Sequence, residues 1–294
     1  GDILILVRKY HDGKTNDSEI IRELLDLRKN FSKIIYFDDS AAASIAFFCA
    51  FPFVDQYWKR SKLINENLYK KKFYGGHVYS DFYHQKFGIE DKSQMFFNPV
   101  ATSETDMNKL KISWNIGIGV YPLNSNDILD KYYQAARRFI TSLTVLPSIY
   151  PIHFLIKRYF LRMKTELKKE VLFKNKNTKF SSRFLDVNYR NSIGFQRNLL
   201  IRKTKENKNF LVGHKAKREF TKETFTTYGL LSPFGWGEIC YRDFEAAIGG
   251  SILIKPDMSH ISTWPNIYSR DMYEQLRWDF TNLNNLNVLF DEPK

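Results

Sequence analysis

Cysteine is scarce in this chain. Its 294 residues include only Cys49 and Cys240, far apart in the sequence, so we expect no disulfide framework of the kind found in secreted proteins, and a reducing compartment is favoured. The chain also lacks the run of about eighteen apolar residues that a membrane span needs. Its first residues, GDILILV, lack the basic region of a signal peptide and are typical of a core strand. We therefore expect a cytoplasmic protein, with Cys240 a small buried residue rather than a nucleophile.

Acidic residues are also few relative to basic ones. The chain has 45 Lys and Arg against 32 Asp and Glu, which gives a net charge of +13. Such a balance favours a partner of opposite sign, namely nucleic acid, an anionic lipid surface or a phosphorylated substrate. The absence of a zinc-finger spacing, an RNA-recognition signature and a homeodomain-like helix disfavours nucleic acid. A hydrophobic content of 43% with 25 Phe and 17 Tyr predicts a folded globular protein.

The order of apolar segments predicts an α/β fold. Residues 2–7 and 33–37 are expected to be strands on either side of a helix that is capped at Asp17 or Ser18 and ends near Asn30. Short connections between them favour a parallel sheet. Strand candidates at 184–189, 209–212 and 230–234 alternate with helical segments, so the second half is expected to form another Rossmann-like sheet.

One stretch carries most of the chemistry. Residues 231–257, LSPFGWGEICYRDFEAAIGGSILIKPD, are typical of a strand, a tight loop, a helix at about 239–248 and a further strand. The glycines on either side of Trp236 allow a ligand to approach the backbone closely. The start of the following helix can hold a phosphate with its N–H groups and dipole. The same pattern is also typical of a well-capped βαβ unit with a buried Arg–Glu pair.

The side chains of this stretch fit a nucleotide sugar. Arg242 can add a forked charge to the phosphate oxygens, and Glu245 can accept hydrogen bonds from two sugar hydroxyls. The donor-binding residues predicted from the loop and helix are Gly235, Trp236, Gly237, Glu238, Arg242 and Glu245.

The run SPFGWGEICYRDFEAAIGGSILIKPDMSHISTWP resembles the donor-binding segment of GT-B glycosyltransferases, particularly the group 1 and exostosin-like branch. Arg242, Glu245, Ala246 and Gly250 stand where that branch has its Arg-x-x-Glu-Ala pattern and Gly-rich helix end. The resemblance implies that Glu245 holds the ribose and that Arg242 faces the diphosphate. Only six residues lie between Glu238 and Glu245, where retaining enzymes often have seven, which favours inversion.

The GT-B resemblance implies two Rossmann-like domains facing across a cleft. We expect an acceptor-binding domain at 1–135, a helical linker at 136–183 and a nucleotide-sugar-binding domain at 184–294. In that arrangement His214 and Lys215 would border the nucleobase pocket. Arg197 is a further candidate phosphate contact, with an exposed surface arginine as the alternative.

An inverting transfer needs a base that takes the proton of the acceptor hydroxyl. Asp39 follows the second strand, at the edge where parallel sheets bind ligands, although the Asp38-Asp39 pair is equally typical of a strand-end turn. Asp81 and His84 lie in an aromatic segment with three glycines. The catalytic candidates are therefore Asp39, Asp81 and His84. The spacing of His77, Asp81 and His84 also permits a metal site, but the resemblance implies that no metal or other cofactor is required.

Residues 149–179 mix aromatic and aliphatic side chains with lysines and arginines. Such a segment can lie on an anionic membrane or pack against a domain with its lysines in water. The predicted function is transfer of a sugar from a nucleotide-sugar donor to a glycan or lipid-linked glycan acceptor, in the cytoplasm, with peripheral membrane contact if the first alternative holds. The alternatives are a nucleotide-sugar epimerase or hydrolase of the same fold, and a basic module that binds nucleic acid or polysaccharide.

Overall fold

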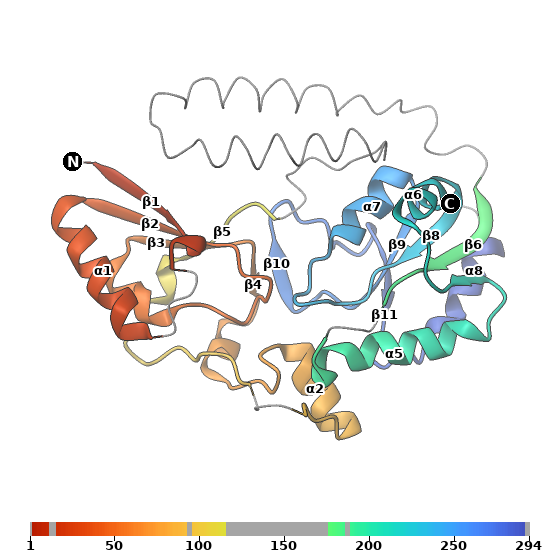
Figure 1. Cartoon of the computed structure of the whole chain (residues 1–294), viewed down its shortest axis with the longest axis horizontal. Helices are drawn as coiled ribbons and strands as arrows, with labels where there is room; N and C mark the ends of the chain where they lie inside the picture. Colours follow the sequence, from red (N-terminus) through yellow and green to blue (C-terminus); the bar gives the residue numbers. More distant parts are fainter. Residues whose placement is uncertain (1, 12–15, 93–95, 116–175, 186–188, 292–294) are drawn as a thin grey trace.

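The computed structural model describes residues 2–11, 16–92, 96–115, 176–185 and 189–291 (Figure 1). We call residues 2–115 the N-terminal half and residues 176–291 the C-terminal half. Each half contains a parallel sheet, and the predicted mixed α/β fold class is confirmed. Among the described residues, no helix is long and apolar enough to cross a bilayer. The segment 149–175, in which we expected basic amphipathic character, lies outside the described residues.

The N-terminal sheet has the strand order β1-β2-β3-β5. Its strands follow one another in chain order, and every pair is parallel. The helix between the first two strands packs on the face that carries Leu6, Ile34 and Tyr36. The elements of this half are β1 (Ile3–Val7), η1 (Arg8–His11), α1 (Asp17–Asn30), β2 (Lys33–Asp38), η2 (Phe48–Phe53), β3 (Gln56–Lys59), β4 (Ser61–Leu63), η3 (Glu66–Lys70), α2 (Val78–Phe87), η4 (Met107–Lys109) and β5 (Leu110–Ile112).

Helix α1 forms where the apolar spacing predicted it. Its N-cap is Asn16, the residue before the predicted cap positions Asp17 and Ser18. The side chain of Asn16 accepts a hydrogen bond from the Ser18 N–H at 2.9 Å, which satisfies one of the free donors at the helix start. Ile20 and Leu24 are buried, whereas Leu25 is exposed. The buried face of this helix is therefore narrow.

The C-terminal sheet has the order β11-β9-β8-β6-β7 and is also parallel. Helices cover both of its faces, with α5 on one side and α6 and α7 on the other (Figure 1). The elements of this half are β6 (Asn177–Ser182), α5 (Asn191–Lys205), β7 (Phe210–Val212), α6 (Lys217–Thr226), β8 (Thr227–Leu231), α7 (Tyr241–Gly249), β9 (Ile252–Pro256), β10 (Ile261–Thr263), β11 (Glu274–Leu276), η7 (Leu283–Asn287) and α8 (Val288–Asp291).

The first strand of this sheet corrects the sequence prediction. We expected it at 184–189, but β6 spans Asn177–Ser182, inside the range predicted to be linker. The sequence NTKFSS has too few apolar residues to signal a buried strand. Its serines are nevertheless buried because their hydroxyls are satisfied: Ser181 donates to Glu223 at 3.0 Å, and the Ser182 and Thr204 hydroxyls lie 3.0 Å apart.

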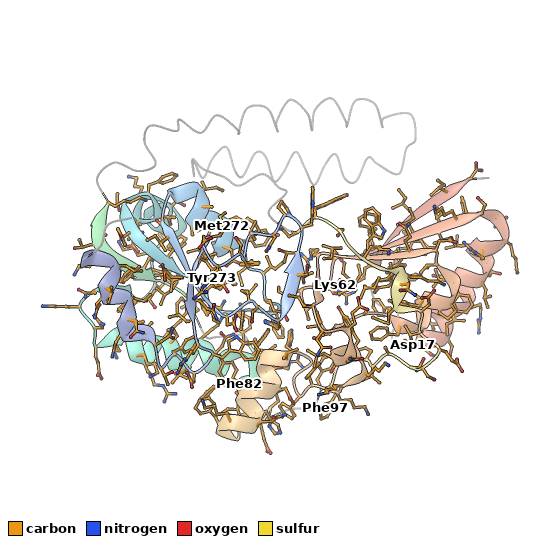
Figure 2. All side chains as sticks on the ribbon, turned by 180° about the vertical axis from the view of Figure 1, so that it is seen from behind. Asp17, Lys62, Phe82, Phe97, Met272 and Tyr273 are labelled. Atoms are coloured by element: carbon orange, nitrogen blue, oxygen red, sulfur yellow. The ribbon has the colours of Figure 1, made fainter. Side chains whose placement is uncertain are left out.

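The two halves meet through packed side chains (Figure 2). One hydrophobic cluster contains Leu6 and Tyr57 from the first half together with Phe234 and Ile261 from the second. The short strand β4 also pairs with β10, antiparallel, across the junction. Phe82 of α2 meets Trp278 edge to face with ring centroids 5.3 Å apart. Because apolar burial drives this contact, the halves share a core at the junction.

Candidate functional site

A cavity of about 580 Å3 opens at the carboxyl edge of the C-terminal sheet. The chain leaves β6 toward β7 on one side and then returns to β8 on the other, so the order of strands reverses at β6. Crevices at such reversals are where open parallel sheets bind ligands. The cavity is lined by Arg183, Phe184, Leu185, Tyr189, Arg197, Gly213, His214, Lys215, Phe220, Trp236, Arg242 and Glu245.

The structure brings together six of the nine predicted donor-binding residues in this lining. They come from four separate places: Arg197 from α5, His214 and Lys215 from the loop after β7, Trp236 from the loop after β8, and Arg242 with Glu245 from α7. They converge because the loops after parallel strands meet at one edge of the sheet.

Helix α7 begins with an ordered cap that fixes this side of the cavity. The N-cap residue is Cys240, and its N–H donates to the Asp243 carboxylate at 3.0 Å. That carboxylate is fully buried and pairs with Lys255 of β9 at 3.0 Å. The left-handed Gly250, with φ of 63°, ends the helix as predicted. The first turn of α7, with Arg242, is therefore held rigidly against the sheet.

Arg242 is the most constrained cation of the site. One Nη donates to the Arg183 carbonyl at 2.6 Å, and the guanidinium lies 5.6 Å and 5.2 Å from the ring centroids of Phe184 and Phe220. Its Nε is buried and has no hydrogen-bond partner among the described residues. Burial lowers the pKa of Arg242, and the nearby Glu245 opposes that shift. A buried donor without a partner favours an anionic ligand at this position.

Arg197 lies on the opposite wall. Its Nε donates to the Phe234 carbonyl at 2.7 Å and its Nη1 to the Leu185 carbonyl at 2.8 Å. The guanidinium lies 4.6 Å from the centroid of the Tyr189 ring, a distance typical of a cation–π contact.

Two further cations of the lining are already paired. Arg183 and Lys215 both contact the Glu223 carboxylate, at 3.0 Å and 2.9 Å. Burial alone would raise the pKa of Glu223, but hydrogen bonds from Arg183, Lys215 and Ser181 hold it below its usual value. The positive field available to a ligand therefore comes mainly from Arg197 and Arg242.

Aromatic side chains form the rest of the wall. Trp236 is half exposed, and its ring lies 5.4 Å from that of Tyr189 and 5.7 Å from the Arg190 guanidinium. Sequence reasoning missed Arg183, Phe184, Tyr189 and Phe220 in this lining. The first two directly follow β6, so placing that strand correctly would have identified them.

The remaining predicted donor residues do not line the cavity. Gly235, Gly237 and Glu238 belong to the same turn as Trp236 and contact the N-terminal half. A Cβ on Gly237 would lie 2.0 Å from the Ala41 carbonyl oxygen, so this glycine allows close approach of backbone from the other half. Glu238 is fully buried and accepts from the Ala43 N–H at 3.0 Å. Burial would raise the pKa of Glu238, but His260, His77 and that N–H lower it.

The three catalytic candidates lie in the N-terminal half, outside the cavity lining. Asp39 is exposed after β2, whereas its neighbour Asp38 is buried in an ion pair with Lys59 at 3.0 Å. Burial lowers the pKa of the neighbouring Arg60, and the nearby Asp39 opposes that shift. Asp39 therefore lies at the carboxyl edge of the N-terminal sheet, directly after β2.

Asp81 and His84, both on α2, have partners close to them in the sequence. The Asp81 carboxylate accepts from the Tyr74 N–H at 3.0 Å and from the Gln85 amide at 2.5 Å. The His84 ring stacks on Tyr74 with centroids 3.9 Å apart, and its Nδ1 donates to the Ile89 carbonyl at 2.8 Å. These contacts hold the segment around α2 together. In the described part of the chain, no group of three metal-ligating side chains is arranged to hold an ion.

Neither the protein-family models nor the curated proteins searched contain a match to this chain.

Proposed function

We propose that the chain is a glycosyltransferase of the GT-B type, which moves a sugar from a nucleotide-sugar donor to a glycan or lipid-linked glycan acceptor. The observation that carries this proposal is the cavity at the strand reversal, where three arginines, several aromatic rings and Glu245 converge. An anionic diphosphate, a flat base and a pair of ribose hydroxyls need these three kinds of side chain.

Different residues bind the diphosphate, the ribose and the base of the donor. Arg242, with its unpartnered buried Nε, and Arg197 hold the diphosphate. Glu245, one turn along α7, accepts hydrogen bonds from the ribose hydroxyls. The rings of Phe184, Tyr189 and Trp236 offer flat surfaces to the base.

Transfer in this proposal is inverting and needs no metal. The acceptor oxygen forms a bond to the anomeric carbon as the bond from that carbon to the diphosphate oxygen breaks. Asp39, exposed at the carboxyl edge of the N-terminal sheet, takes the proton of the acceptor hydroxyl. Arg242 stabilises the negative charge that develops on the departing diphosphate.

The test begins with a thermal-shift screen of the protein against nucleoside diphosphates and their sugars, since a ligand that binds the folded state raises Tm. We expect one nucleotide to raise Tm. Arg242→Gln should weaken its binding about tenfold or more, because a charge-assisted hydrogen bond contributes roughly 1.5–3 kcal/mol. Arg202→Gln, at an exposed position on α5 that is not among the residues lining this cavity, is the matched control and should bind normally.

Glu245→Ala should abolish donor use and leave the fold intact, as judged by circular dichroism. Normal transfer by this variant would refute the assigned role. Product formation from the donor without any acceptor would instead indicate an epimerase or hydrolase. Steeply salt-dependent binding to DNA, with no saturable nucleotide binding, would indicate a basic binding module.

A further inference from the structure

The turn Gly235–Glu238 contacts both halves of the molecule. On one side the indole of Trp236 lines the nucleotide cavity. On the other side the turn packs against residues of the N-terminal half, which precede it in the sequence by more than 150 positions. Figure 1 shows α2 at the junction, close to the start of α5.

Side chains form hydrogen bonds with three consecutive backbone carbonyl groups, at the start of this turn and just before it. Arg197 donates to the Phe234 carbonyl at 2.7 Å, Tyr79 donates to the Gly235 carbonyl at 2.7 Å, and His77 Nε2 lies 3.0 Å from the Trp236 carbonyl. Both ring nitrogens of His77 face carbonyl oxygens, which only accept, so the ring donates to the Trp236 carbonyl when Nε2 carries the proton. Two of the three donors therefore belong to the N-terminal half.

The donors are themselves fixed. His77 and Tyr79 are almost completely buried, and the other ring nitrogen of His77 lies 2.9 Å from the Gly75 carbonyl. The Tyr79 ring packs on Phe234 with centroids 4.5 Å apart. A buried donor whose rotamer is set by packing imposes its position on its partner.

We propose that His77 and Tyr79 are positioning residues of the nucleotide cavity, and that the N-terminal half thereby sets the affinity for the donor without touching it. This inference rests on the function proposed above. Holding the Gly235 and Trp236 carbonyls fixes the peptide planes on either side of the Trp236 Cα. It therefore fixes the direction in which the indole enters the cavity beside Tyr189.

The chain offers a matched control for this inference. Tyr83 lies one turn further along α2, is as buried as Tyr79, and also donates its hydroxyl to a carbonyl of the C-terminal half. Its partner, however, is Trp278, which does not line the cavity. Tyr79→Phe and Tyr83→Phe each remove one buried donor to the C-terminal half, and only the first releases the turn.

The experiment measures the affinity of each variant for the nucleoside diphosphate that the thermal-shift screen selects. We expect Tyr79→Phe to weaken binding about tenfold, since leaving one buried carbonyl without its partner costs a free energy of this order, and Tyr83→Phe to bind like the wild type. His77→Leu should weaken binding similarly, and His77→Gln, which keeps an N–H donor, should restore part of it.

A spectroscopic readout separates positioning from stability. In protein labelled with 5-fluorotryptophan, the Trp236 resonance, assigned with Trp236→Phe, should shift in Tyr79→Phe and stay unchanged in Tyr83→Phe. Unchanged affinity and an unchanged Trp236 resonance in Tyr79→Phe and His77→Leu would overturn the inference. A wild-type protein that binds no nucleoside diphosphate would overturn the proposed function itself, and with it the premise of this inference.

Discussion

The two parallel sheets differ in how their strands are ordered. In the N-terminal sheet β1, β2, β3 and β5 follow the chain in one direction, whereas the C-terminal sheet reverses direction at β6. The reversal sends α5 to one face and α6 and α7 to the other, because crossovers between parallel strands are right-handed. The loops after β6 and β8 then diverge and leave the cavity between them. A reversal of strand order thus places the candidate site in the second sheet.

The two sheets nevertheless share one structural feature. Each has a fully buried Lys–Asp ion pair near its carboxyl edge, Lys59 with Asp38 in the first and Lys255 with Asp243 in the second, both at 3.0 Å. Each carboxylate also accepts from a tyrosine hydroxyl, that of Tyr57 or Tyr268. Buried charges persist when further hydrogen bonds satisfy them.

Lys255→Met is expected to have the largest effect on stability. It leaves the Asp243 carboxylate without its cation, which should lower the free energy of unfolding by about 3–5 kcal/mol, and Lys59→Met should do the same in the other sheet. Chemical denaturation followed by circular dichroism measures both. Because the halves share a core, each variant should unfold in a single transition. Lys29→Met, which breaks an exposed pair with Asp26, is the control and should change little.

If either lysine variant lost only half of its circular dichroism signal at low denaturant, the two sheets would unfold independently.

Gly237→Ala is expected to have an intermediate effect. The new Cβ would lie 2.0 Å from the Ala41 carbonyl oxygen, and a backbone atom cannot move aside cheaply, so we expect a loss of about 1–3 kcal/mol. In Gly235→Ala, two residues earlier, the closest atom would be the Tyr189 hydroxyl at 3.4 Å. That variant should be closer to wild type in its free energy of unfolding. Equal stability of the two variants would contradict the close approach of the halves.

The smallest effect concerns the dependence of stability on pH. Hydrogen bonds from Arg28 lower the pKa of Asp55 to about 2, and a hydrogen bond from Lys86 does the same for Asp279. A carboxyl with a depressed pKa stabilises the fold above its unfolded pKa of about 4, and this contribution is lost as the pH falls through about 2. Since both side chains are partly exposed, each contributes at most ~1 kcal/mol.

Asp55→Asn tests a pair within the N-terminal half, and Asp279→Asn tests a pair that joins α2 to the C-terminal half. Each should reduce the loss of stability between pH 4 and about pH 2, as measured by urea denaturation at several pH values. If a variant lost stability toward acid as steeply as the wild type does, the corresponding ion pair would not contribute to stability.

Much of the C-terminal sheet could be predicted from the sequence because its signals are local. The glycine-bounded loop, the helix that ends at Gly250 and the apolar strand after it follow one another within about thirty residues. Arg242 and Glu245 lie three positions apart, which places them on one side of any helix. β6 escaped prediction because its buried serines are satisfied by Glu223 and Thr204, partners distant in the sequence.

The sequence by itself determined the α/β class, the parallel β-α-β start and the grouping of Arg242 with Glu245 on α7. Only the tertiary structure decided that Asp38 is buried while Asp39 is exposed, and that Glu238 meets Ala43, 195 positions away, instead of the cavity. The physical reason is that periodicity and capping report interactions within a few residues. The partner of a buried polar group across the junction depends instead on how the two sheets pack together.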